Sequence, residues 1–331
     1  MSTLEVKGLG KRFPVRGTGI RRELLDAVAD VSFTLRPGNV TALVGESGSG
    51  KSTVARLLAR LYAPTDGTIV FDGKDVGDQW RRKTLLAYRS HVQMIFQDPF
   101  ASLNPVKRIE HHIARPLLIH GICSRGAVDG RVRELLARVG LVPPEEIAQK
   151  YPHQLSGGQR QRVAIARALA VEPSVILADE PISMLDVSIR IGILNLILQL
   201  KRELQIAFLY ITHDIASARY VADRLIVMYA GQIAETGPIE DVLASPKHPY
   251  TQLLLSAVPD PRAPLGVAAE TDKGEPPKVI DPSPGCRFRW RCPLAIDTCS
   301  RVTPVLAELA PGHQAACHVA QSGAEVKAFS A

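Results

Sequence analysis

The sequence predicts an α/β fold built around a phosphate-binding loop, with an antiparallel β edge, a helical insert and a small cysteine-bearing C-terminal extension. Three observations support it. A glycine-rich segment at residues 45–53 separates an apolar run (41–44) from a predicted helix. Later apolar runs have the length of buried strands and end in polar residues. The region 103–149 instead spaces its apolar residues three and four apart, as in helices.

The segment 45–53 reads GESGSGKST and fits the phosphate-loop pattern G-x-x-x-x-G-K-[ST]. Glycines let successive N–H groups face phosphate oxygens, Lys51 can reach the β- and γ-phosphates, and Ser52 can bind Mg²⁺. A flexible Gly/Ser turn is the alternative, which the flanking strand and helix disfavour. Nucleotide binding is therefore predicted for Gly45, Ser47, Gly48, Ser49, Gly50, Lys51, Ser52 and Thr53.

The composition is that of a globular protein of about two domains, with 331 residues, 46% hydrophobic and 22% charged. The clearest apolar run, 191–200, is far shorter than the ~20 residues of a membrane-spanning helix. The first residues contain no signal-peptide core, so we expect a cytosolic protein. The net charge of +7 permits an acidic partner, but no basic block with interleaved aromatics favours nucleic acid.

Residues 4–13 and 25–35 are predicted strands on either side of a polar, basic insertion. They would form the edge hairpin over a nucleotide. Phe13 is the aromatic best placed to stack on a base, and a half-buried strand residue is an equally good interpretation. A further short strand, 68–71, lies between Asp-Gly turns.

Residues 155–162 open a predicted helix. Ser156 is first of all a helix cap. Gly157, Gly158 and Gln159 also leave backbone N–H groups and the positive end of the helix open to an anion, without a lysine nearby in sequence.

Two predicted core strands are followed by polar residues at their carboxyl ends, where ligands bind in α/β sheets. Asp179 and Glu180 follow the strand 175–178, and His213 follows the strand 206–211. Asp179 suits Mg²⁺ coordination and Glu180 suits polarising a water. The alternatives are a chance acidic turn and a structural histidine. The core is predicted to close after a hairpin over 225–234, near residue 245.

In this order the elements resemble the nucleotide-binding subunit of an ATP-binding-cassette (ABC) transporter, over residues 1 to about 245. The resemblance implies a Walker A loop at 45–53, a Q-loop Gln97, a signature motif at 155–159 and a switch His213. It also implies a Walker B Asp179, a catalytic Glu180 and a D-loop Asp186, although Met184 stands where alanine is usual. Mg²⁺ would be held by Ser52, Gln97 and Asp179. The signature residues Ser156, Gly157, Gly158 and Gln159, with Asp186, would complete the ATP site of a second cassette.

The chain most resembles the ATPase subunits of bacterial dipeptide and oligopeptide importers, a family that also imports nickel and glutathione. This closer resemblance is carried by residues 97–105, by the segment 248–251 and by the tail. Implied partners are a second, non-identical ATPase subunit, two permease subunits and an extracytoplasmic binding protein, at the cytoplasmic face of the membrane. We expect a nucleotide-binding domain at 1–245, with its helical subdomain at about 98–165, and an extension at 246–331. An ABC-type ATPase acting on nucleic acid, or a non-hydrolysing structural cassette, is the competing interpretation.

Four of the five cysteines lie in the tail, at intervals of five, six and seventeen intervening residues. Disulfides are rare in the cytosol, and the intervals fit neither close zinc pairs nor ferredoxin spacing. Arg287, Arg289 and Arg291 would favour thiolates and hence a soft-metal site. From the family resemblance we expect Cys286, Cys292, Cys299 and Cys317 to bind a [4Fe–4S] cluster, with Zn²⁺ as the alternative.

Overall fold

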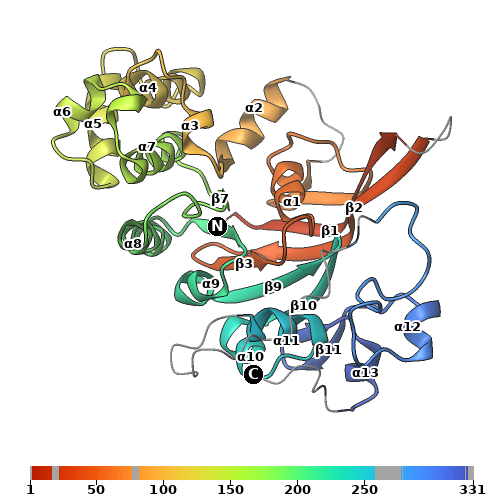
Figure 1. The fold of residues 1–331 in the computed structure, drawn as a ribbon. Helices are drawn as coiled ribbons and strands as arrows, with labels where there is room; N and C mark the ends of the chain where they lie inside the picture. Colours follow the sequence, from red (N-terminus) through yellow and green to blue (C-terminus); the bar gives the residue numbers. More distant parts are fainter. Residues whose placement is uncertain are drawn as a thin grey trace.

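The structure, a computed structural model, describes residues 2–16, 22–76, 82–257, 277, 279–324 and 326. It contains an eight-stranded sheet, a four-stranded sheet and a group of helices to one side (Figure 1). The predicted α/β class, antiparallel edge and helical insert are confirmed. In the described part of the chain, no helix has the length and apolar character needed to cross a membrane.

The eight-stranded sheet has the order β11-β12-β10-β9-β3-β8-β7-β6. Its core strands are β3 (Val40–Val44), β6 (Val92–Ile95), β7 (Val175–Asp179), β8 (Ala207–Thr212), β9 (Arg224–Tyr229) and β10 (Gln232–Pro238). The first five of these strands are parallel, and β10 returns antiparallel to β9 as predicted. The carboxyl ends of β3, β7 and β8 therefore meet at one edge of the sheet.

Buried side chains on both faces explain why these strands read as continuous apolar runs. In β3, Val40, Ala42 and Val44 belong to one hydrophobic cluster, and Leu43 belongs to the other. Strands β7 and β8 alternate in the same way. The sheet is thus fixed from two sides, which holds the loops at its edge in place.

The four-stranded antiparallel sheet has the order β2-β1-β4-β5. Its strands are β1 (Leu4–Arg16), β2 (Arg22–Leu35), β4 (Asp66–Phe71) and β5 (Lys74–Asp75). It packs over the cluster that contains Leu43, together with helix α1 (Lys51–Leu58). The predicted basic insertion falls mainly on residues 17–21, which lie outside the described residues.

The predicted helical insert forms a group at one side of the sheet (Figure 1). Its helices are α3 (Pro99–Ser102), α4 (Ile109–Ile119), α5 (Val128–Arg138), α6 (Pro144–Gln149) and α7 (Gly157–Leu169). Three further helices belong to the sheet region: α2 (Arg82–His91), α8 (Val187–Leu204) and α9 (Ile215–Val221). Helix α8 packs in the same cluster as the helical group.

The tail is tied to the main sheet, which the sequence did not predict. Strand β12 (His313–Ala315) pairs antiparallel with β10, and β11 (Ala307–Ala310) pairs with β12. Helix α10 (Ile239–Ala244) follows β10, and the tail helices are α11 (Pro249–Ser256), α12 (Asp297–Arg301) and α13 (His318–Gln321). The fully buried Glu235 of β10 accepts hydrogen bonds from the backbone N–H groups of Lys247 and His248 (2.6 and 2.9 Å). It also contacts His313 Nε2 at 2.6 Å, so one carboxylate joins β10, β12 and the entry to α11.

Candidate functional site

The phosphate loop joins β3 to α1 at the edge of the main sheet. Two glycines allow its curvature. Gly45 has a φ of 155°, and a Cβ there would lie 2.2 Å from the carbonyl oxygen of Met228. Gly50 has a φ of 101°, and its Cβ would lie 2.4 Å from the carbonyl oxygen of Ala27. Neither position has room for a side chain, whereas a Cβ at Gly48 would meet open space.

Lys51, the first residue of α1, is buried with its ammonium group inside the loop. Its Nζ donates to the carbonyl oxygens of Gly45 and Glu46 at 2.7 and 2.8 Å. Burial lowers the pKa of Lys51, while the carboxylates of Glu180, Asp179 and Glu46 oppose that shift. A cation in this position, at the positive end of a helix, suits a polyphosphate.

Ser52 and Asp179 bring two oxygen ligands together from different elements. The Ser52 hydroxyl donates to Asp179 Oδ1 at 2.9 Å, linking α1 to the end of β7. Burial raises the pKa of Asp179, and the Ser52 hydrogen bond partly offsets the rise. A hydroxyl and a carboxylate beside a phosphate-binding lysine fit a hard cation such as Mg²⁺.

Glu180 lies at the centre of a second cluster. Gln97 donates its Nε2–H to Glu180 Oε2 at 2.9 Å, and His213 Nδ1 lies 3.2 Å from Oε1. Glu180 has a φ of 46°, a left-handed conformation that is costly for a residue with a side chain and is often found at active sites. Gln97, Glu180 and His213, separated by more than 30 residues each, thus converge, and their catalytic roles stay predictions.

Family comparisons agree with this geometry. The family described as ABC transporter matches residues 28–183, and the family described as Oligopeptide/dipeptide transporter, C-terminal region, matches residues 234–299. The oligopeptide transport ATP-binding protein AppF of Bacillus subtilis is 44% identical over 320 residues, covering 96% of this chain and 97% of AppF. The chain belongs to the ABC transporter family, as an ATP-binding, ATP-hydrolysing cassette subunit.

Other relatives extend the comparison. A putative peptide import ATP-binding protein of Brucella ovis is 45% identical over 314 residues, 95% of this chain and 96% of that protein. The glutathione import ATP-binding protein GsiA of Pectobacterium atrosepticum is 50% identical over 258 residues, 77% of this chain and 41% of GsiA. A solved dimeric, post-hydrolysis structure of the cassette MJ0796, bound to ADP and Pi, has a TM-score of 0.63 and 31% identity, covering 71% of this chain and 98% of that one.

The signature segment of the cassette begins α7, in the helical group. Ser156 is the N-cap of this helix: its hydroxyl accepts from the Gln159 N–H at 3.2 Å, and Gln159 Oε1 accepts from the Ser156 N–H at 3.0 Å. The cap interpretation is therefore confirmed. A Cβ on Gly158 would lie 2.5 Å from Ile189 in α8, the helix that Asp186 begins. These two helix starts lie together, and the role of Ser156 to Gln159 and Asp186 toward another cassette stays a prediction.

Phe13 lies half-buried in β1. Its ring packs edge-to-face with that of Tyr62, with 5.4 Å between the two ring centroids. Lys11 Nζ lies 5.2 Å from the centroid of the Phe13 ring. These contacts fit the interpretation as a strand residue, and stacking on a base stays a prediction.

The tail reaches the phosphate loop directly, and sequence reasoning missed this contact. Arg291 binds the Glu46 carboxylate through both terminal nitrogens, at 2.7 and 2.9 Å. The hydroxyl of Tyr250 accepts the Glu46 backbone N–H at 2.9 Å. Glu46 occupies a variable position of the loop pattern, so the motif alone carried no signal for this pair.

The iron–sulfur prediction is wrong. Among the residues that the structure describes, no group of three or more His, Cys, Asp or Glu side chains could hold a metal ion, which also removes the zinc alternative. The supporting argument from the arginines fails for two of the three. Arg287 and Arg291 pair with Asp26 and Glu46 of the cassette, so they do not serve to stabilise thiolates.

Burial instead favours the protonated form of three tail thiols. It raises the pKa of Cys286 and of Cys292 to about 11 and raises that of Cys317. Cys286, Cys292, Cys299 and Cys317 are free cysteines, with Cys299 and Cys317 buried. They behave as small apolar residues of the tail core.

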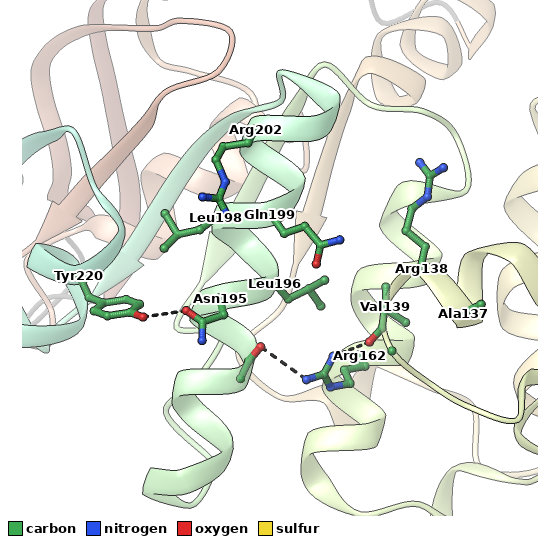
Figure 2. A pocket seen from close by; sticks show the side chains of 12 residues that line it. Ala137, Arg138, Val139, Arg162, Asn195, Leu196, Leu198, Gln199, Arg202 and Tyr220 are labelled. Carbon is green, nitrogen blue, oxygen red and sulfur yellow. Dashed lines mark hydrogen bonds between the residues drawn. The ribbon is translucent and has the colours of Figure 1, made fainter.

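A cavity of about 690 Å³ lies away from these residues, between α5, α7 and α8 (Figure 2). Arg162 spans it by donating to the carbonyl oxygens of Val139 and Gly192. Tyr220 closes one side with a 2.7 Å hydrogen bond to Asn195. None of the predicted site residues lines this cavity.

Proposed function

We propose that this chain is the ATP-hydrolysing subunit that powers peptide import through an ABC transporter in the cytoplasmic membrane. The observation that carries the proposal is the convergence of Lys51, Ser52, Asp179 and Glu180 in a chain whose peptide-import relatives match along nearly its whole length. The match of the tail to the oligopeptide/dipeptide transporter C-terminal region supports the cargo class.

In this proposal the residues of the loop, Gly45, Ser47, Gly48, Ser49, Gly50, Lys51, Ser52 and Thr53, hold the phosphates of ATP. Ser52, Asp179 and Gln97 would hold Mg²⁺, which when bound neutralises charge on the β- and γ-phosphates. Gln97 uses its Nε2 toward Glu180, so its Oε1 is the atom available to the cation.

Glu180 orients the attacking water and accepts its proton. Gln97 and His213 each contact one of the two carboxylate oxygens, which restricts the orientation of the carboxylate. His213, with 61% of its side chain exposed, would contact the γ-phosphate.

We further propose that two cassettes close on ATP, the dimeric MJ0796 structures being the supporting relatives. The signature residues and Asp186 of each would face the phosphate loop of the other, most simply in a pair with a related but non-identical subunit. Residues 1–245 form the nucleotide-binding domain and 246–331 the extension. The remaining partners would be two permease subunits and an extracytoplasmic binding protein, with this chain peripheral at the cytoplasmic face and no role for nucleic acid.

Glutathione import is a second candidate, because GsiA is 50% identical over 258 residues. Glutathione is itself peptide-like, so the same ATPase chemistry serves either cargo.

The test is transport by vesicles containing this chain with the permease subunits and binding protein that copurify with it. ATP-driven uptake of labelled di- and oligopeptides is the expected result, and Glu180→Gln should abolish it. Uptake of glutathione alone would establish the second candidate. An ATPase that responds to neither solute would refute peptide import.

A further inference from the structure

An acidic side chain stands within the anion-binding loop. Glu46 immediately follows Gly45, and its side chain is 26% exposed. Its field is one of those acting on Lys51, the cation that the loop offers to phosphate. A free carboxylate here would repel a triphosphate and would compete with it for Lys51.

The tail neutralises that carboxylate. Arg291, with 8% of its side chain exposed, holds Glu46 through a two-pronged ion pair at 2.7 and 2.9 Å. The pair fixes the carboxylate toward the tail, because both of its oxygens are engaged by one planar guanidinium group.

The arginine is itself held in place by aromatic side chains from both parts of the chain. Its guanidinium carbon lies 5.8 Å from the ring centroid of Tyr229 and 6.0 Å from that of Phe288. Tyr229, Tyr250 and Phe288 pack against one another at 4.6 to 5.5 Å. Tyr250 also accepts the Glu46 N–H, so backbone and side chain of this loop residue have separate partners beyond residue 245.

A second tail arginine acts on the other end of the loop. Arg287 pairs with Asp26 of β2 and donates to the carbonyl oxygen of Ala230. The next residue of β2, Ala27, places its carbonyl oxygen where a Cβ of Gly50 would be. Tail residues therefore contact one end of the phosphate loop directly, at Glu46, and the strand beside its other end, at Asp26.

We propose that Arg291 is a positioning residue of the ATP site: it neutralises Glu46 and holds it toward the tail, which couples docking of the C-terminal tail to nucleotide affinity. The inference rests on the proposed binding of ATP by this loop. Coupling between two binding events is reciprocal, so bound ATP should also stabilise the docking of the tail against the cassette.

The test measures the dissociation constant of a non-hydrolysable ATP analogue with Mg²⁺ for the full-length chain, by titration calorimetry. Arg291→Met keeps the length of the side chain without its charge and should weaken binding about tenfold. Adding Glu46→Gln to that variant should restore affinity to within about threefold, since no carboxylate is left to neutralise. Arg291→Lys keeps the charge but not the two-pronged geometry, so it should weaken binding less than Arg291→Met does.

Arg301→Met is the matched control, because Arg301 is 78% exposed and its nearest acidic partner, Asp297, is 4.0 Å away. It removes the same charge from the tail and should leave affinity unchanged. Hydrogen exchange of residues 286–292 should slow when the analogue binds to the wild type and not to Arg291→Met.

The outcomes separate the two hypotheses. If Lys51→Ala binds the analogue as tightly as wild type, the proposed function itself fails. If Lys51→Ala weakens binding but Arg291→Met does not, the coupling is refuted. A double variant as weak as Arg291→Met, or an equally weak Arg291→Lys, would show that packing rather than neutralisation is responsible, and would also overturn the proposal.

Discussion

Replacing Glu180 with glutamine tests the proposed chemistry most directly. The change is nearly isosteric: one side-chain oxygen remains to accept from Gln97 or from His213, which now lie 2.9 and 3.2 Å from the carboxylate. What is lost is basicity toward water. Removing a general base costs about 10²- to 10⁴-fold in rate. At about 1.4 kcal/mol per decade, the barrier should rise by roughly 3 to 6 kcal/mol.

Binding should respond differently from turnover in this variant. Lys51 and the Ser52–Asp179 pair do not depend on Glu180 for their hydrogen bonds, so affinity for ATP should change by less than about threefold. Lys51→Ala is the complementary variant and should mainly weaken binding.

The assay is phosphate release by the assembled transporter, with nucleotide affinity measured on the same preparations. Turnover of Glu180→Gln within about fivefold of wild type would refute the role of Glu180 as the base. A loss of ATP affinity as large as that of Lys51→Ala would instead assign Glu180 to binding.

Three further predictions concern the paired site and the tail. Ser156→Arg should abolish trapping of nucleotide at the partner cassette's phosphate loop and spare the Lys51 site of its own chain, as nucleotide crosslinking to each subunit would reveal; the reverse pattern would contradict head-to-tail pairing. Glu235→Ala leaves three donors, of which those of His248 and His313 are buried, without their acceptor and should cost roughly 3 to 9 kcal/mol of unfolding free energy, at about 1 to 3 kcal/mol per group. Denaturant unfolding measures it, and a loss below about 1 kcal/mol would contradict the network's importance. Burial lowers the pKa of His248 to about 4, so the unfolded chain takes up a proton first as pH falls, and stability should drop by roughly 2 kcal/mol between about pH 6.5 and 5. His248→Asn keeps a capping side chain and should flatten that slope; an equal slope in both proteins would rule out His248 as its source.

Local patterns were sufficient to predict the cassette core. The apolar runs that became β3, β7 and β8 are buried on both faces, and each is followed by its functional residues within the chain. Because parallel strands end at one edge, strand order alone brings Glu180 toward His213. The helical insert was equally visible, since helix periodicity is a short-range property.

The tail could not be predicted in this way. Strands β11 and β12 have four and three residues. They acquire their conformation by pairing, β12 with β10 and β11 with β12, and not from their own sequence. The state of the tail cysteines could not be predicted for a related reason. Arginines next to thiols in sequence imply thiolates only if their charge is not used elsewhere, and here Arg287 and Arg291 are used by acidic residues of the cassette.

The Glu46–Arg291 pair is a contact that the phosphate-loop motif does not predict. The fixed positions of the phosphate loop are determined by the shape and charge of phosphate. Every such loop binds the same group, so these positions can be identified from the sequence alone. Glu46 stands at a variable position, and its partner lies 245 residues away. An acidic residue at such a position must be neutralised by something that the motif does not specify. The place to look for chain-specific control of ATP binding is therefore the variable positions of the loop and the segments that pack against them.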